Sequence, residues 1–245
     1  MIFQQNNPTE TSLPELMLYD LSTRQTERLV AGADRPAVFW ADDDLVVWGQ
    51  YTPDHSATLM KILDRSTELV TTYPEVTEFE MGFPYLLSVE KHKVIATLLS
   101  APCATDYTEW NLDMWLLDVD SQEWKPIAND PVWQQVLFHI QWPLVVYLDY
   151  GVACTGNYVD EYEYSRKQAY MVIHNLETDV RRPIPLPFDF YRPIALSENW
   201  KLIFRKYDSV RVREPAYILD LVAAGLVDEV GNVIPDPTFP PVAGN

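Results

Sequence analysis

The sequence predicts an all-β fold in which one structural unit is repeated along the chain. The first observation is a hairpin pattern that occurs five times, in which an apolar strand, an Asp or Asn, a polar turn and a second strand follow one another. The second is that short apolar runs rich in Val, Ile, Leu and aromatic residues alternate with turn residues along most of the chain, which is typical of strands. Residues 219–227 are the one segment with some helical pattern.

The five hairpins share an Asp or Asn at the start of the turn. They read LMLYDLSTRQTERLV from Leu16, TLMKILDRSTELV from Thr58, MWLLDVDSQEWKPI from Met114, AYMVIHNLETDVRRPI from Ala169 and AYILDLVAAGLVDEV from Ala216. A short acidic or amide side chain at this place accepts backbone N–H groups two residues further on and closes the turn. These turn residues are 44, 54, 57 and 45 positions apart and are Asp20, Asp64, Asp118, Asn175 and Asp220.

A second hairpin precedes four of the five. Its copies read AVFWADDDLVVWGQY from Ala37, PYLLSVEKHKVIATLL from Pro84, VLFHIQWPLVVYLDY from Val136 and PIALSENWKLIFRKY from Pro193. Two hairpins provide four strands in about 50 residues, which is the make-up of a propeller blade. We therefore predict a β-propeller of five four-stranded blades.

The first blade is incomplete in the sequence, because only IFQQNN stands before its hairpin at 16–30. We expect the propeller to occupy residues 1–231 and the Pro-rich tail 232–245 to close it, with Val233 and Ile234 as a short closing strand. An unpaired sheet edge promotes aggregation, so closure has a physical reason. The alternative is an open edge that another chain, or a further part of a longer parent protein, completes.

These hairpins resemble those of TolB-like and WD-repeat β-propellers. YDLSTRQTERL is similar to the outer-hairpin motif YDL-x-[ST]-G-x-x-x-x-L, and FWADDDLVVWG and ALSENWKLIFRK are similar to the inner-hairpin motif W-S-P-D-G-x-x-[IL]-[AV]-F. The resemblance covers most of the chain, but Arg24 and Asp44 stand where these families have Gly. It implies a propeller fold and proteins that act more often as binding scaffolds than as catalysts.

The charge of the chain excludes several classes of partner. There are 36 Asp and Glu against 18 Lys and Arg, a formal net charge of −18, so nucleic acid and anionic membranes are disfavoured. The glycine motifs GxGxxG, GxxxxGK[ST] and GxSxG do not occur, and we expect no cofactor. The beginning of the sequence has no basic and apolar leader and no run is long enough to cross a bilayer, so we expect a soluble, cytoplasmic protein without membrane insertion.

Metal and disulfide sites are not expected. Cys103 and Cys154 are the two cysteines and are predicted to be free thiols, with a loop-to-loop disulfide as the alternative. The acidic run 42–44 and the pair at 118 and 120 are interpreted as turns, because ligand loops for divalent cations need further alternating ligands. The histidines show no HxH or HExxH spacing and lie in different elements; they are His55, His92, His139 and His174.

Long loops are the predicted binding region, because they gather on one face of such a scaffold. Segments 100–111 and 149–168 come from neighbouring blades, and 206–215 is the third long loop. Acids interleaved with aromatic residues suit a basic protein or peptide through ion pairs and cation–π contacts. The alternative is a set of solvated loops whose tyrosines pack on one another. The predicted binding residues are Asp106, Tyr107, Glu109, Trp110, Asp149, Tyr150, Tyr158, Asp160, Glu161, Tyr162, Glu163 and Tyr164.

We expect no enzyme, because the sequence shows no acid inside an apolar inner strand where burial would raise its pKa. Glu90 and Glu198 fall in hairpin turns, and Asp149 is the one tolerable candidate for a glycosidase carboxylate. The predicted function is a non-catalytic interaction module. The alternatives are a carbohydrate-binding or glycoside-hydrolase propeller, in which exposed aromatic residues stack on sugars, and a subunit or fragment that completes a propeller with another chain.

Overall fold

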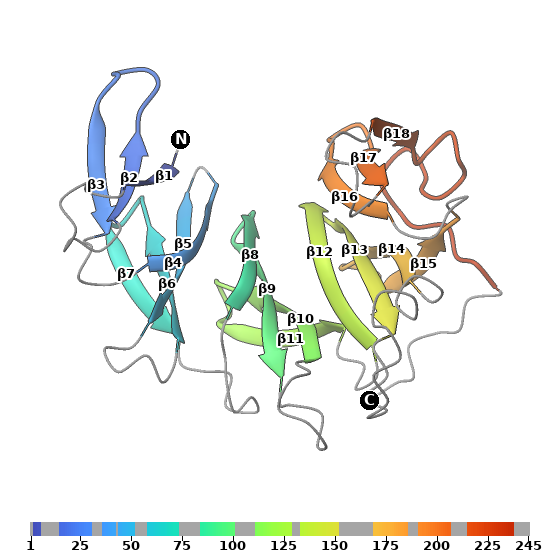
Figure 1. Ribbon diagram of the computed structural model, residues 1–245, viewed down its shortest axis with the longest axis horizontal. Helices are drawn as coiled ribbons and strands as arrows, with labels where there is room; N and C mark the ends of the chain where they lie inside the picture. Colours follow the sequence, from blue (N-terminus) through green and yellow to red (C-terminus); the bar gives the residue numbers. More distant parts are fainter. Residues whose placement is uncertain are drawn as a thin grey trace. The chain divides into compact units, whose positions relative to one another are not determined.

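The computed structural model forms eighteen strands in five antiparallel sheets within the residues it describes (Figure 1). It describes residues 2–5, 15–30, 36–42, 44–51, 58–73, 84–100, 111–128, 133–151, 169–185, 191–206 and 215–237. In every sheet the strands that are neighbours in sequence are also hydrogen-bonded neighbours. This order is that of consecutive hairpins, as the repeats predict.

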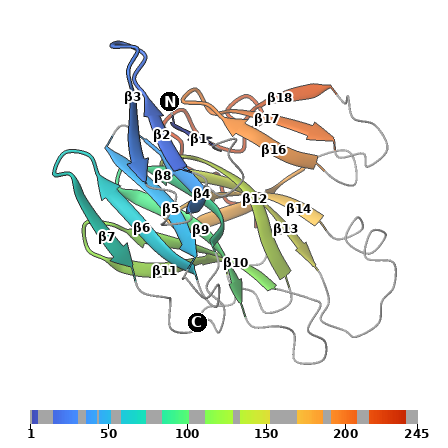
Figure 2. The same cartoon turned by 60° about the vertical axis from the view of Figure 1, so that its left-hand side comes forward.

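The strand bounds follow the predicted blades closely. The first sheet holds β1 (Ile2–Gln5), β2 (Glu15–Tyr19) and β3 (Thr26–Val30), and the second β4 (Pro36–Ala41), β5 (Leu45–Tyr51), β6 (Thr58–Asp64) and β7 (Leu69–Tyr73). The third holds β8 (Pro84–Glu90), β9 (Lys93–Ser100), β10 (Asn111–Asp118) and β11 (Glu123–Ala128). The fourth holds β12 (Trp133–Gln141), β13 (Leu144–Gly151), β14 (Ala169–Asn175) and β15 (Val180–Ile184), and the fifth β16 (Tyr191–Leu196), β17 (Lys201–Lys206) and β18 (Ala216–Asp220) (Figure 2).

Two of these sheets have three strands. Among the residues that the structure describes, the first sheet has no strand beyond β1 on its inner side, as the short segment before residue 16 predicts. The fifth sheet differs from the prediction, because its outer hairpin forms only β18 and residues 221–226 form a turn. The same turn occupies most of the segment that had some helical pattern, and no helix forms there.

The predicted turn residues close their hairpins as expected. In each, the side-chain oxygen accepts a backbone N–H from two or three residues further along, at 2.7 to 3.1 Å. These acceptors are Asp20, Asp64, Asp118, Asn175 and Asp220. An inner turn uses the same device, because Asp42 accepts the N–H groups of Asp44 and Leu45 at 2.9 and 2.7 Å. The acidic run 42–44 therefore forms a turn.

Four outer hairpins place a side chain in the left-handed backbone region four positions after the Asx residue. The φ values are 58° for Arg24, 57° for Glu68, 59° for Gln122 and 57° for Asp179. Glycine adopts this conformation without steric cost, whereas other residues pay for it. Arg24 therefore occupies a turn position that does require left-handed backbone, while Asp44 does not have a positive φ.

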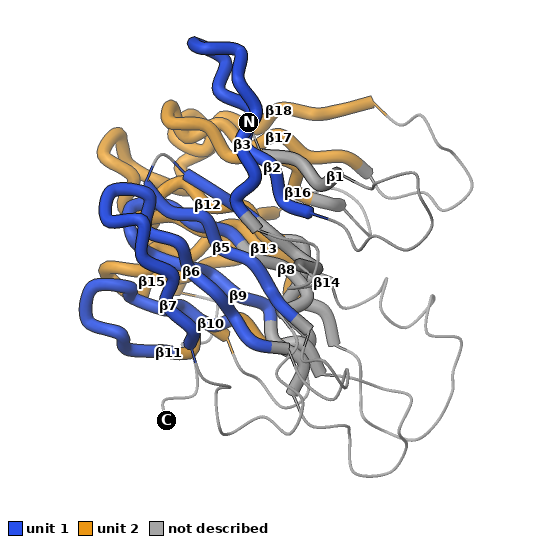
Figure 3. Tube along the Cα trace, turned by 90° about the vertical axis from the view of Figure 1, so that its left-hand side faces the viewer, with its two compact units in different colours: residues 1–101, 115–125 blue, residues 102–114, 126–245 orange. Residues whose placement is uncertain are grey.

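The chain divides into two compact units, one of residues 1–101 and 115–125 and the other of residues 102–114 and 126–245 (Figure 3). The core of unit 1 comes from alternate residues of the second and third sheets, namely Leu45, Val47, Met60, Ile62, Tyr73, Val89, Val94, Ala96, Trp115 and Leu117. A smaller cluster joins Leu16 of β2 to Val46 and Trp48 of β5. Each fully buried large aliphatic side chain contributes about 1.5–3 kcal/mol.

The core of unit 2 lies between the fourth and fifth sheets and the segment after β18. It consists of Leu144, Val146, Leu148, Met171, Ile173, Ile184, Leu196, Leu202, Phe204, Leu221, Leu226, Val227 and Val233. The alternation of buried residues along β13 and β14 follows from the side-chain period of a strand. The fourth and fifth sheets therefore form a packed scaffold within this unit.

The segment after β18 folds back on unit 2. Val233 pairs with Val227 in an isolated antiparallel bridge, and the N–H of Ile234 donates to the Leu226 carbonyl at 3.0 Å. Arg182 Nη1 donates to the Ile234 carbonyl at 2.8 Å. Val233 and Ile234, which were expected to close the first blade, thus form these backbone hydrogen bonds within unit 2. Residues 238–245 lie outside the described residues, and closure of the propeller by the tail stays a prediction.

Candidate functional site

Most of the predicted binding residues lie outside the described residues. This applies to Asp106, Tyr107, Glu109, Trp110, Tyr158, Asp160, Glu161, Tyr162, Glu163 and Tyr164, and also to Cys103, Cys154 and His55. Asp149 and Tyr150 are described as part of β13, whose last residue precedes the segment 152–168. Asp149 therefore connects the predicted binding region to the described fourth sheet.

Asp149 lies on the face of the fourth sheet that holds Tyr147, because alternate residues of a strand share a face. The register places Asp149 opposite Gln135 of β12 and Tyr170 of β14. Tyr147 is completely buried, and burial raises the pKa of its phenol, with the negative charge of Asp149 acting in the same direction. This phenol therefore stays protonated at neutral pH and does not serve as a base.

The same face carries a second buried polar side chain, His174 of β14. Its imidazole is 2% exposed, and Nε2 lies 2.8 Å from Asp179 Oδ1 in the turn that follows. Its ring centroid lies 6.4 Å from that of Tyr147, with the ring planes inclined by 58°. Asp179 itself is well exposed. The buried side chains of Tyr147 and His174 therefore lie side by side, and His174 contacts the exposed Asp179 carboxylate in the turn after β14.

A separate polar cluster surrounds His92 in unit 1. His92 and Lys91 form the two-residue turn between β8 and β9, and both have positive φ, at 59° and 50°. The imidazole Nδ1 lies 2.9 Å from Asp120 Oδ1, and Nε2 lies 4.0 Å from Asp44 Oδ2 of the second sheet. The hydrogen bond to Asp120 raises the pKa of His92, and the charges of Asp44 and Asp42 add to this effect. This histidine links turns of two adjacent sheets.

One buried acid was missed by the sequence argument. Asp113 of β10 is 5% exposed; β10 is the first strand of an outer hairpin, so the expectation that no acid lies inside an apolar inner strand did not cover it. A usable signal was the apolar run that follows it, because Met114, Trp115, Leu116 and Leu117 are all buried. Since successive residues of a strand point to opposite faces, this part of β10 is buried on both faces. Asp113 is the third residue of β10.

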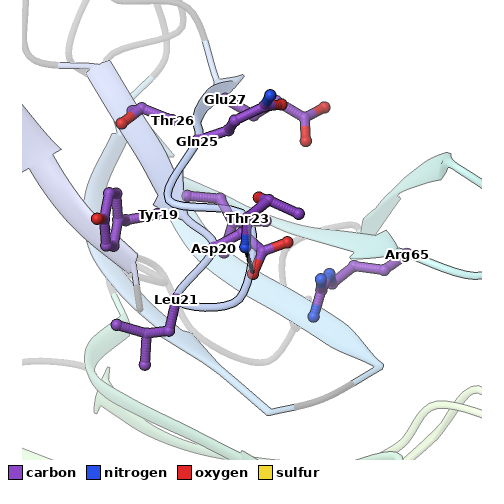
Figure 4. Close-up of a pocket in the computed structure, with 9 residues that line it drawn as sticks. Tyr19, Asp20, Leu21, Thr23, Gln25, Thr26, Glu27 and Arg65 are labelled. Atoms are coloured by element: carbon purple, nitrogen blue, oxygen red, sulfur yellow. Dashed lines mark hydrogen bonds between the residues drawn. The ribbon is translucent and has the colours of Figure 1, made fainter.

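An open groove of about 690 Å³ lies along the outer hairpin of the first sheet (Figure 4). It is lined by β2, β3 and their turn, and Arg65 reaches it from the turn between β6 and β7. Hydrogen bonds from Ser22 and Thr23 lower the pKa of Asp20 to about 2. The Asp20 carboxylate is ionised at neutral pH, and its Oδ1 already accepts hydrogen bonds from Ser22. It therefore stabilises the turn and has no proton to donate as a general acid.

No group of three or more His, Cys, Asp or Glu side chains within the described residues is arranged to hold a metal ion. In the same part of the chain, no helix is long and apolar enough to span a membrane.

The comparisons with known proteins support the fold. No protein-family model matches the sequence, and the search of curated proteins found no match. Among solved structures, TolB from Acinetobacter baumannii matches with TM-score 0.54 and 12% identity, over 97% of this chain and 53% of that chain. The β-propeller domain of the Trilobed protease from Pyrococcus furiosus, which has an open velcro topology, matches with TM-score 0.61 and 12% identity, over 89% and 62%.

A third similar structure is an oligogalacturonate lyase in complex with manganese, with TM-score 0.52 and 13% identity, over 85% of this chain and 57% of that chain. The chain thus spans between about half and three fifths of these neighbours. At such identities the likeness concerns the fold alone. Because the neighbours include TolB, a protease domain and a lyase, the fold does not distinguish binding proteins from enzymes. The chain therefore has an all-β, TolB-like β-propeller fold.

Proposed function

We propose that this protein is a non-catalytic interaction module that binds a basic protein or peptide through the acidic, aromatic loops 100–111 and 149–168. The observation that carries the proposal is the contrast between connections in the fourth sheet. Its hairpin turns at 142–143 and 176–179 are short, whereas residues 152–168 separate β13 from β14. A long connection on a packed scaffold is where binding residues concentrate.

The charge of the chain supports a basic partner. The net charge of −18 favours encounter with a positively charged surface and repels other anions. Within 149–168, acids alternate with tyrosines in the stretch NYVDEYEY. Tyrosine rings add cation–π contacts with Lys or Arg to the ion pairs. Asp149 is half-buried near the end of β13 and is the first residue of the segment 149–168.

The pKa shifts of described carboxyl groups also favour binding over catalysis. A general acid for glycoside hydrolysis needs a raised pKa. Four carboxyl groups in turns have a lowered pKa, with hydrogen bonds as the main cause; they are Asp20, Asp64, Asp118 and Asp228. These groups are ionised acceptors in turns and do not offer a proton at neutral pH.

The test compares two charge-reversal variants of equal charge. The first changes Asp160, Glu161 and Glu163 to Lys, and the control changes the exposed Glu123, Glu198 and Glu229 to Lys. Binding of a fluorescent Lys- and Arg-rich peptide is measured by anisotropy at low and high salt. We expect the loop variant to lose at least about tenfold in affinity, since each lost charge pair is worth up to about 1 kcal/mol.

The control variant should lose much less affinity, because it changes the net charge without changing the loops. Equal losses in the two variants would mean that only the overall charge matters, and unaltered binding in the loop variant would refute the proposed face. The carbohydrate alternative rests on Trp110, Tyr158 and Tyr162, which lie outside the described residues. A glycan array combined with a reducing-sugar release assay tests it.

A second candidate function is a subunit or fragment that completes a propeller with another polypeptide. The observation that favours it is the pair of three-stranded sheets, of which the fifth has Ile218 68% exposed on its edge strand β18. Mass measurement in solution, with and without residues 238–245, examines this candidate. A monomer whose stability is unchanged by removal of the tail would contradict both completion by a partner copy and closure by the tail.

A further inference from the structure

The outer edge of the second sheet differs from the outer edges of the first, third and fourth sheets. Its edge strand β7 reads LVTTY and contains neither a charged residue nor a proline. The edge strands β3, β11 and β15 read TERLV, EWKPIA and VRRPI and all carry charges, with proline in the last two. Charges and prolines protect edge strands against pairing with other strands. β7 has no such protection.

β7 is accessible along most of its length. Its first four residues are exposed, with Leu69 66% and Val70 53% accessible, and only Tyr73 at its end is buried in the core. Figure 1 and Figure 2 both show β7 as the outermost strand of its sheet, beyond β6. An edge strand presents the N–H and C=O groups of alternate residues outward. These groups form a template for one more strand.

The strand is also held firmly enough to act as a template. It pairs with β6 over five consecutive positions, from Asp64 opposite Leu69 to Met60 opposite Tyr73. Lys61 Nζ donates to Thr72 Oγ1 at 2.5 Å and ties the two strands together through their side chains. An incoming segment therefore meets an ordered edge and does not have to order it first, which lowers the entropic cost of binding.

We propose that β7 is a strand-addition site that takes an extended, uncharged segment with basic flanks from another protein. The β-branched and apolar residues of β7 favour a segment of the same character through cross-strand contacts. Unit 1 contains 18 acidic and 8 basic residues in its sequence, so basic flanks are attracted and a second copy of the chain is repelled. The site goes beyond the loops of the proposed function and relies on that function only for the sign of the partner's charge.

The experiment uses a synthetic peptide with a Val-Thr repeat between Lys pairs, and a second peptide of the same sequence that is N-methylated at alternate residues of one edge. Anisotropy measures the binding of each peptide to the full chain. We expect the first peptide to bind and the methylated peptide to lose at least about tenfold in affinity, because each methyl group removes a backbone donor. Equal binding of the two peptides would overturn the proposal, and so would no binding of the first.

Two variants separate strand pairing from simple charge attraction. Thr71→Lys and Thr71→Glu both place a charge in the middle of the edge, and both should weaken binding of the first peptide. Attraction alone predicts that Thr71→Glu strengthens binding, which would overturn the proposal. Thr26→Lys and Thr26→Glu are matched controls on β3, an edge that already carries charges, and should have little effect. Thermal unfolding verifies that all four variants are folded.

The loop variant with Lys at 160, 161 and 163 distinguishes this proposal from the proposed function. It should bind the strand peptide with most of its wild-type affinity, because it leaves β7 unchanged. Loss of strand-peptide binding in that variant, with normal binding in Thr71→Lys, would assign the peptide to the loops and overturn the β7 site. A wild-type chain that dimerises without peptide, and loses the dimer on Thr71→Lys, would replace the basic partner by a second copy.

Discussion

Glycine at the left-handed turn positions should stabilise this protein. Arg24, Glu68 and Gln122 have φ values of 58°, 57° and 59° and are exposed in outer hairpins of unit 1. The left-handed conformation costs a residue with a Cβ about 1–2 kcal/mol, and glycine loses about 0.5–1 kcal/mol through the larger entropy of the unfolded chain. Each substitution should therefore raise the free energy of unfolding by about 0.5–1 kcal/mol.

Two controls use neighbouring or equivalent positions. Thr67 precedes Glu68 in the same turn without a positive φ, so Thr67→Gly should lower stability by about 0.5–1 kcal/mol. Asp179 has φ 57° but also holds His174 Nε2 at 2.8 Å. Loss of that hydrogen bond costs about 1–3 kcal/mol, so Asp179→Gly should bring no gain.

Urea denaturation measures these differences, with midpoints and slopes determined for each variant. The substitutions at 24, 68 and 122 lie in separate hairpins and should add, for a combined gain of about 1.5–3 kcal/mol. In thermal unfolding this corresponds to about 2–4 °C for each kcal/mol in a chain of this size. If the triple variant is no more stable than the wild type, or if Thr67→Gly stabilises as much, the argument from backbone conformation is wrong.

Two further predictions concern the pH dependence and the segment after β18. The pKa of His92 is raised mainly by Asp120, so this pair stabilises the fold below the unfolded pKa of about 6.5 and loses its effect as the pH rises through the folded pKa. In urea titrations, the stability of the wild type relative to His92→Asn should therefore fall as the pH rises above the unfolded pKa of about 6.5, and a pH-independent difference would contradict this. Gly231→Ala should cost more than about 2 kcal/mol, because φ is 88° and a Cβ would lie 2.5 Å from the Trp200 ring. At Gly225 φ is 67° and a Cβ meets nothing within 4 Å, so Gly225→Ala should cost only about 1 kcal/mol, and equal losses in thermal unfolding would refute the contact argument.

The fold was predictable because local sequence determines both ends of each hairpin. The Asp or Asn that accepts backbone N–H groups marks the turn, and the apolar runs on either side mark the strands. Both signals act within a few residues and do not depend on distant contacts. The missing innermost strand of the first sheet was predictable for the same reason, since the sequence before residue 16 has room for one strand only.

The fifth sheet shows where local signals fail. The segment from Ala216 matches the outer-hairpin pattern, but Leu221 and Leu226 are buried in the core of unit 2, and the N–H of Leu226 donates to the Leu221 carbonyl at 2.9 Å. Burial of these two side chains stabilises a compact turn relative to a fourth strand of the sheet. The pattern of the segment does not reveal this preference, because it depends on the neighbouring fourth sheet, which supplies six of the thirteen core residues of this unit.

The polar clusters were hidden for a similar reason. His92 and Asp44 are far apart in sequence, and only the packing of two adjacent sheets brings their side chains within 4.0 Å of each other. Asp113 directly precedes four consecutive buried residues, 114–117. Its burial depends on packing against both faces of β10, which local sequence does not reveal.

The turn acids determine which charge-reversal experiments are informative. Asp20 and Asp64 accept the side-chain hydroxyl and the backbone N–H of the serine two residues on, and these hydrogen bonds lower their pKa values. Replacing either with Lys would open a turn, and a loss of affinity would then report a structural change. The acidic residues in such turns therefore contribute to the −18 charge but have a structural role in closing the hairpins. A basic partner is better sought with substitutions that leave every turn acceptor in place, at 160, 161 and 163 and at Thr71.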